Sequence, residues 1–174
     1  MSQLLFKGIG MLVTLAIGAG VYLLFFKADP VKEAKDDAPA VGSCVSAEGP
    51  TTQVDLKETD CAEPTATYKV TAEGAKCDKN EVNYTMTVTG STGSTDPAVE
   101  LCLTYNVAKG DCVDFPIAAT QPAQKVACKG KKGSTTVLKV TLVDAKSAST
   151  KCPGQTVQRL PNKTRNSLIC FGEV

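Results

Sequence analysis

The words Gly42-Ser-Cys-Val45 and Gly110-Asp-Cys-Val113 open two similar halves of the chain. Each word is followed by three further cysteines, and the residues next to those cysteines recur in the same order. Thr59-Asp-Cys61 in the first half corresponds to Val126-Ala-Cys128 in the second. Recurrence at a fixed period is the signature of an internal duplication. The sequence therefore predicts two copies of one small unit, placed in tandem.

We place the first repeat at residues 43–108 and the second repeat at residues 109–174. Repeats of this size bury too small a fraction of their surface to be stable without cross-links. The chain also has no Trp, five Phe and four Tyr, so we expect a thin core made mostly of Val, Leu and Ala. We therefore expect each repeat to be a small β unit that is cross-linked by disulfides.

Eight cysteines, four in each repeat, supply the cross-links. They are Cys44, Cys61, Cys77, Cys102, Cys112, Cys128, Cys152 and Cys170. Zinc is the competing use of cysteine, but the chain has no His and no Cys-x-x-Cys pair. If the bridges stay within each repeat and both repeats agree, three pairings remain. We favour first with fourth and second with third, which predicts Cys44–Cys102, Cys61–Cys77, Cys112–Cys170 and Cys128–Cys152.

Residues of alternating polarity predict strands. Val82, Tyr84 and Met86 alternate with Asn and Thr, and the same period of two continues from Val99 to Val107. This period is typical of a half-buried strand. Turns rich in Gly, Ser and Pro separate the runs, and no stretch after residue 26 has a convincing helical period. We expect an antiparallel all-β domain of about eight to ten short strands.

An uncharged apolar run, residues 8–26, precedes the repeats. As a helix it would be about 28 Å long, which matches the hydrocarbon core of a bilayer. We expect a transmembrane helix between a short N-terminal segment, 1–7, and a charged linker, 27–42. A cleaved signal peptide is the alternative, but the apolar residues continue to Phe26, far past a small-residue cleavage site.

A stripe of small residues follows one face of this expected helix. Gly10, Thr14 and Gly18 are spaced four residues apart, so another helix could approach the backbone closely along them. The stripe predicts lateral docking onto another membrane protein or a second copy. The alternative is that Gly is simply common in membrane helices.

Two signals disagree about the side of the membrane on which the repeats lie. Lys7 precedes the apolar run, whereas Lys27, Lys32 and Lys35 follow it, which favours a cytoplasmic domain by the positive-inside tendency. The cysteines favour the opposite side, because disulfides persist in oxidising compartments. We follow the cysteines and predict a single-pass plasma-membrane protein with a cytoplasmic N-terminus and an extracytoplasmic C-terminal domain.

The two repeats carry opposite charge. Residues 43–108 contain four Lys against ten Asp and Glu, a net charge of −6, and residues 109–174 contain eleven Lys and Arg against four acidic residues, a net charge of +7. Either the repeats attract each other, or a basic face binds an acidic protein, an anionic polymer or anionic lipid. That face would consist of Lys125, Lys129, Lys131, Lys132 and Lys139. Nucleic acid is not an expected partner, because no aromatic residue is interleaved with these lysines.

The usual catalytic groups are missing from the sequence. Without His there is no common general base and no Ser-His-Asp or Cys-His arrangement. Asp111 and Asp114 flank Cys112, but no such acid pair recurs in the first repeat, so we interpret them as solvated turn and strand-edge residues. We predict a protein that is not an enzyme, with no cofactor and no metal site.

The words Gly110-Asp-Cys-Val113 and Val126-Ala-Cys128, with their counterparts from Gly42, resemble those of the actinobacterial LppU-type and septum-formation-like envelope proteins. The resemblance covers residues 42–174. It implies a secreted or anchored β module with disulfides, located in the cell envelope, and no particular activity. The chain differs in having no lipid-attachment cysteine and no Pro-His after the second cysteine of either repeat, so a lipoprotein is not expected.

Together these features predict a membrane-anchored accessory or structural subunit of a larger cell-envelope complex, for example a respiratory assembly. The helix would contact an integral membrane protein, and the outer domain would contact the same partner. An extracytoplasmic binding module for a cell-wall polymer, anionic lipid or soluble ligand is the alternative. A thiol–disulfide redox protein is a third reading, which requires a reactive cysteine pair.

Overall fold

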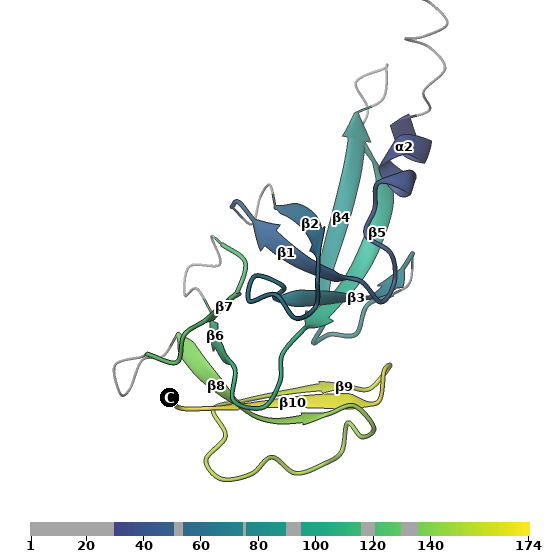
Figure 1. Ribbon diagram of the computed structural model, residues 1–174. Helices are drawn as coiled ribbons and strands as arrows, with labels where there is room; N and C mark the ends of the chain where they lie inside the picture. Colours follow the sequence, from purple (N-terminus) through teal and green to yellow (C-terminus); the bar gives the residue numbers. More distant parts are fainter. Residues whose placement is uncertain (1–29, 51–53, 75, 90–94, 116–120, 130–135) are drawn as a thin grey trace, which may run out of the picture. The chain divides into compact units, whose positions relative to one another are not determined.

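The computed structural model describes residues 30–50, 54–74, 76–89, 95–115, 121–129 and 136–174 (Figure 1). The described residues fall into two bodies. One body contains residues 30–37, 87–89 and 95–98, and the other contains the described parts of 38–86 and 99–174. The second body holds most of both repeats, and the contacts between repeats reported below lie within it.

The first repeat forms a five-stranded antiparallel sheet. Its strands are β1 (Cys44–Glu48), β2 (Asp55–Thr59), β3 (Tyr68–Glu73), β4 (Val82–Thr89) and β5 (Thr95–Tyr105), in the order β2-β1-β3-β5-β4. The alternating runs from Val82 and from Val99 lie in β4 and β5. The sequence-based prediction of these two strands is therefore confirmed.

The second repeat forms another five-stranded sheet with the same connectivity. Its strands are β6 (Cys112–Asp114), β7 (Gln124–Val126), β8 (Val137–Asp144), β9 (Gln158–Asn162) and β10 (Ser167–Gly172), in the order β7-β6-β8-β10-β9. Each strand therefore corresponds to the one five places earlier in the chain. The predicted all-β fold is confirmed, and the shared strand order supports the predicted duplication.

Backbone details recur in both sheets. The N–H of Gly42 donates to the carbonyl of Val70, and the N–H of Gly110 donates to that of Val140, each at 2.9 Å. Both glycines have a positive φ, 96° and 102°, which side chains disfavour. The recurrent Gly before the first cysteine of each repeat is thus a turn residue.

Each sheet also contains a bulge at the same position. Thr71 has no partner in the β3–β5 register, and Thr141 has none in the β8–β10 register. The hydroxyl of Thr71 donates to the carbonyl of Cys102 at 2.9 Å, and that of Thr141 donates to the carbonyl of Cys170 at 3.1 Å. At each bulge, the threonine hydroxyl therefore supplies a hydrogen bond to a cysteine carbonyl of the neighbouring strand.

All eight cysteines form disulfides, as predicted, but the favoured pairing is wrong. The bridges are Cys44–Cys61, Cys77–Cys102, Cys112–Cys128 and Cys152–Cys170, which join first with second and third with fourth. The hairpin of β1 and β2 places Cys44 opposite Thr59, so Cys61 follows at the same end of the hairpin. A bridge from Cys44 to Cys102 would have to cross β3, which lies between β1 and β5.

The core contains mainly Val, Leu and half-cystines. One cysteine of every disulfide is almost fully buried, and the largest fully buried side chain belongs to Phe171. Fully buried residues from both sheets include Val45, Val70, Leu101, Leu103, Val113, Val140 and Leu168. The expectation of a thin aliphatic core is confirmed.

A short helix, α2 (Pro30–Asp36), corrects the prediction that no helix follows residue 26. Pro30 suits the first helical position, and Glu33 in the first turn and Lys35 in the last turn complement the helix dipole. Within the described part of the chain, no helix is long and apolar enough to cross a membrane. The predicted transmembrane run 8–26, with Gly10, Thr14 and Gly18, lies outside the described residues.

Replacing Phe171 by Ala is expected to lower the free energy of unfolding by about 3–5 kcal/mol, because the change leaves a large cavity in the core. Guanidinium denaturation of the oxidised full-length chain in detergent, followed by circular dichroism, measures the effect. Val157 has a side chain that is 54% exposed. Val157→Ala serves as the control and should change stability by less than about 0.5 kcal/mol. Equal effects of the two substitutions would contradict the placement of Phe171.

Candidate functional site

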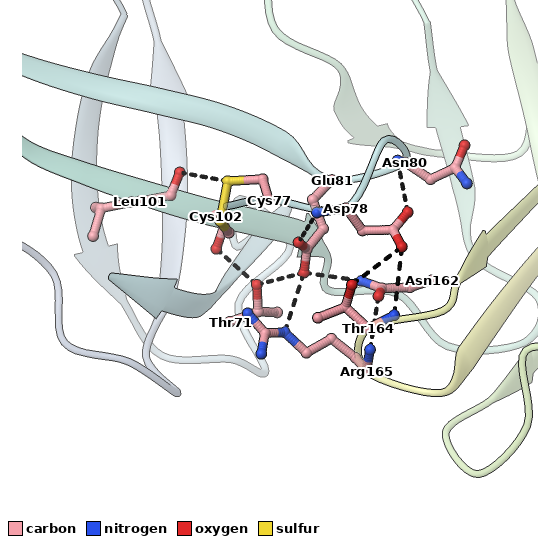
Figure 2. Close-up of a disulfide and its surroundings, with 10 residues drawn as sticks. All are labelled: Thr71, Cys77, Asp78, Asn80, Glu81, Leu101, Cys102, Asn162, Thr164 and Arg165. Carbon is pink, nitrogen blue, oxygen red and sulfur yellow. Dashed lines mark hydrogen bonds and ion pairs between the residues drawn. A yellow bond between two sulfur atoms is a disulfide. The ribbon is translucent and has the colours of Figure 1, made fainter. Parts of the chain in front are cut away.

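A polar cluster joins two turns that are far apart in sequence (Figure 2). One turn, residues 78–81, lies between β3 and β4 of the first repeat and follows Cys77 directly. The other, residues 162–166, connects β9 and β10 of the second repeat. Side chains of each turn bond to the other turn, so this cluster links the two sheets.

The carboxylate of Glu81 lies at the centre of this cluster. Its Oε1 accepts hydrogen bonds from the Thr71 hydroxyl at 2.8 Å and from Asn162 Nδ2 at 2.9 Å, and it contacts Arg165 Nε at 3.4 Å. Its Oε2 accepts the backbone N–H of Asp78 at 2.7 Å. The Glu81 side chain is fully buried. A carboxylate with four donors has little acceptor capacity left for a substrate, so its role is structural.

Asp78 and Asn80 complete the contacts between the turns. Asp78 Oδ2 accepts the backbone N–H of Lys163 at 3.0 Å, and the N–H and hydroxyl of Thr164 lie at 3.4 Å. Asn80 Nδ2 donates to the carbonyl of Pro161 at 2.6 Å. Asp78 Oδ1 also accepts the N–H of Asn80 at 3.1 Å, so the turn is bonded internally as well.

These contacts shift the pKa of both acids. Burial alone would raise the pKa of Glu81, but the hydrogen bonds from Asp78, Thr71 and Asn162 and the charge of Arg165 outweigh burial and lower it. The pKa of Asp78 is lowered mainly by the backbone N–H of Asn80, with further help from Lys163 and Thr164. Both groups are therefore held as carboxylates, which is the form that accepts these hydrogen bonds.

An aromatic cluster joins the repeats at a second place. Tyr68 and Tyr105 of the first repeat lie 5.3 Å apart between ring centroids, and Phe115 and Phe171 of the second repeat lie 5.2 Å apart. Tyr105 contacts Phe115 edge-on at 5.5 Å. Burial raises the pKa of Tyr105 to about 12. Four of the five aromatic residues in 43–174 thus pack across the junction between the repeats.

A groove of about 700 Å³ lies beside this junction. On the side of the first repeat it is lined by Cys61, Ala62 and Pro64, and on the side of the second by Lys125, Val126, Ala127 and Cys128. The connection between the repeats, which includes Val107 and Gly110, also lines it. Its walls are mostly small side chains, with Asp111 and Lys125 as the charged residues.

The five lysines predicted to form a basic face do not share one face. In the second sheet, Lys125 of β7 pairs with Val113 of β6, so the two side chains lie on the same face. Val113 pairs on its other side with Leu138 of β8, whereas Lys139, the next residue of β8, pairs with Cys112. Neighbouring residues of a strand point to opposite faces, so Lys125 and Lys139 belong to different faces of the sheet. Lys129 is exposed, and Lys131 and Lys132 lie outside the described residues.

The remaining predicted groups have structural roles. Asp111 Oδ2 accepts the N–H of Ala108 at 2.9 Å, which makes Asp111 a turn residue, as predicted. For Asp114 the prediction of a solvated side chain is wrong, because its Oδ1 is buried and has no hydrogen-bond partner among the described residues. Cys77, Glu81 and Cys102 lie close enough together to suggest a metal site. They do not fit a metal in this state, because Cys77 and Cys102 are joined in a disulfide. None of the eight cysteines has a free thiol.

The sequence-based reasoning missed the central residues of the polar cluster, Asp78, Glu81, Asn162 and Arg165. Both turns fall in stretches without periodic polarity, so their pattern indicates only loops. The available signal was the opposite charge of the two repeats. The Glu81–Arg165 pair is one contact of the kind expected if the repeats attract each other, which was one of the two interpretations of this charge.

No family model matches the chain, and no curated protein or solved structure matches it either. The resemblance to LppU-type and septum-formation-like envelope proteins therefore stays a prediction. A function has to be inferred from the residues of this chain.

Glu81→Gln is expected to lower the free energy of unfolding at pH 7 by about 2 kcal/mol, because charge-assisted hydrogen bonds are lost while their donors stay buried. The folded pKa of Glu81 lies below its ordinary value of 4.5. The ionised Glu81 carboxylate therefore makes its whole contribution to the free energy of unfolding above pH 4.5. This contribution is lost as the pH falls through the lowered pKa of the folded state. Denaturant unfolding of the wild type and of Glu81→Gln between pH 7 and pH 3 should show that the difference between their free energies of unfolding shrinks below pH 4.5.

Glu100 is exposed on β5 and provides the matched control. Glu100→Gln should change stability by less than about 0.5 kcal/mol at pH 7. A Glu81→Gln effect that stayed constant down to pH 3 would show that the ionised carboxylate does not stabilise the fold.

Proposed function

We propose that this protein is a non-enzymatic, membrane-anchored accessory subunit of a larger cell-envelope complex, with the two repeats outside the cytoplasm. The observation that carries this proposal is the set of four disulfides, which includes every cysteine of the chain. Disulfides of this density belong to oxidising compartments. The apolar run 8–26 supports anchoring, because its length suits a transmembrane helix.

The contacts between the repeats support a structural role rather than catalysis. The buried Glu81 carboxylate is saturated with donors that belong to the protein itself. The aromatic side chains are used in the junction between the repeats, where Tyr105 packs on Phe115 and Phe171. Such a rigid module suits a protein that holds a fixed surface toward a neighbour in the same membrane.

The groove beside the junction favours a second candidate function. In that reading the repeats bind a soluble ligand, a cell-wall polymer or anionic lipid, and the segment 27–42 supplies reach from the membrane. The groove is large enough for a small ligand. It has few polar side chains that converge, which is why we place this function second.

Extraction of the tagged full-length chain from its native membrane with a mild detergent tests the leading proposal. We expect an integral membrane complex to co-purify in stoichiometric amounts, as identified by mass spectrometry. Gly18→Leu should reduce the recovered partner at least about tenfold if the small-residue stripe is the docking face, because a bulky side chain separates closely packed helices.

Ala16→Leu is the matched control, since residue 16 lies on the opposite side of a helix from residue 18. It should leave the recovery of the partner unchanged. Purification of the wild-type chain alone, with no membrane partner, would contradict the accessory-subunit function and favour the binding module.

An alkaline phosphatase fused after Val174 tests the orientation separately. The reporter is active only where its own disulfides form, so we expect high activity in intact cells. A reporter enzyme that is active only in the cytoplasm, fused at the same position, should show low activity. Activity of the cytoplasmic reporter alone would place the repeats inside the cell and contradict the predicted orientation.

A further inference from the structure

The connection between β8 and β9 is longer than its counterpart between β3 and β4 (Figure 1). Cys77 follows Thr71, at the bulge of β3, by six residues, whereas Cys152 follows Thr141, at the bulge of β8, by eleven. The second repeat therefore has five additional residues in this connection. All of them belong to the second body. The extra length gives the second repeat a loop for which the first repeat has no counterpart.

Side chains from three elements hold this connection in place. Asp144, at the end of β8, accepts the N–H of Lys146 at 2.9 Å. Asn166, in the β9–β10 turn, accepts the N–H of Ala148 at 3.2 Å and donates to the carbonyl of Lys146 at 2.6 Å. Arg159 Nη2, on β9, donates to the carbonyl of Ala148 at 2.7 Å. The connection is therefore bonded both to β9 and to the turn that follows β9.

A hollow of about 440 Å³ lies where the connection, β9 and the β9–β10 turn meet. Arg159 and Pro161 are two residues apart on β9, so their side chains point to the same face of the sheet. Among the described residues, the lining contains two basic side chains and no acidic one. The hollow shares no lining residue with the groove beside the junction. It is lined by Ala148, Ser149, Arg159, Pro161, Lys163 and Asn166.

The two basic side chains of the hollow have no acidic partner in the described part of the chain, where the one ion pair joins Arg165 to Glu81. The side-chain hydrogen bonds of Arg159 come from Nη2, which donates to two carbonyls of the connection at 2.7 Å and 3.4 Å. These bonds fix the guanidinium and leave its Nε and Nη1 donors for a ligand. The ammonium group of Lys163 also has no hydrogen-bond partner among the described residues.

Two acids lie near the hollow, but neither lines it. The Asp144 carboxylate is bonded to residues of the connection, and that of Asp78 is bonded to the backbone of the β9–β10 turn. Residues 144–165 contain five Lys and Arg against one Asp, a net charge of +4. More than half of the net charge of +7 of the second repeat is therefore concentrated in the segment that forms the hollow. This charge favours an anionic ligand.

We propose that this hollow binds a phosphate ester. Arg and Lys bind phosphate through charge-assisted hydrogen bonds. The oxygens of a phosphate point in several directions, so one group can accept from Arg159 and from Lys163, whereas the two oxygens of a carboxylate lie in one plane. Ala148 and Pro161 form an apolar wall that suits the carbon skeleton of a polyol or sugar. The volume of the hollow is within the range of small-ligand sites. This inference goes beyond the accessory-subunit function and does not depend on it.

Calorimetric titration of the full-length chain with glycerol phosphate, in micelles of an uncharged maltoside detergent, tests this site. The wild type should bind the phosphate ester saturably. Lys163→Gln should raise the dissociation constant at least about tenfold, because a charge-assisted hydrogen bond to the phosphate is lost. Arg159→Gln should have an effect at least as large. Circular dichroism should show the same folded spectrum for Lys163→Gln, since the ammonium group bonds to no other described residue.

Lys151→Gln is the matched control, because it removes the same charge from the same segment at an exposed residue that does not line the hollow. At about 0.15 M salt it should change the dissociation constant less than about twofold, since screening weakens distant charges. Three results would each overturn the proposal: no saturable binding by the wild type, equal losses in Lys151→Gln and Lys163→Gln, or equal binding of acetate and glycerol phosphate.

Phosphatidylglycerol added to the micelles distinguishes the two sources of such a phosphate, a soluble polyol phosphate and a lipid headgroup. If the headgroup enters the hollow, the lipid competes and the apparent dissociation constant of glycerol phosphate rises with the amount of lipid. An unchanged constant identifies a soluble phosphate ester as the ligand. Both results support the site, because both require the saturable binding that Lys163→Gln weakens.

Discussion

The buried carboxylate of Glu81 is the contact on which the junction of the two repeats depends, because its partners come from both. Thr71 belongs to β3 of the first sheet, whereas Asn162 and Arg165 belong to the second. The aromatic side chains that pack between the repeats bury apolar surface, but the hydrophobic effect has little directional preference. The hydrogen bonds of Glu81 have strict geometry and therefore fix how the two repeats meet.

Much of the fold could be predicted from the sequence, because the relevant patterns are local. The period of two in Val82–Met86 and the recurrent words around the cysteines predicted the strands, the duplication and the existence of the disulfides. The pairing could not be predicted, since it depends on which strands are neighbours. Cys44 pairs with Cys61 because β1 and β2 form a hairpin, and the first repeat has too little periodicity at β2 to reveal that hairpin.

The polar cluster was harder to predict for a related reason. Asp78, Glu81 and Arg165 lie in turns, where no periodicity marks which side chains are buried. The opposite net charges of the repeats suited either attraction between the repeats or a basic face for another partner, and they indicated no location. Few of the many charges participate, and the lysines first grouped as one face are divided by the register of β7, β6 and β8. A net charge describes a whole surface, whereas a junction depends on single contacts.

The two repeats differ in sequence at the position that joins them. Counted from the third cysteine of each repeat, Glu81 corresponds to Thr156 and Asp78 to Pro153. The second repeat therefore lacks the acids that bind the β9–β10 turn, so it cannot bind a third repeat in the same way. A head-to-tail contact with identical surfaces on every repeat would continue without limit. At this position the two sheets therefore have different surfaces, and the contact between the repeats joins two unlike surfaces.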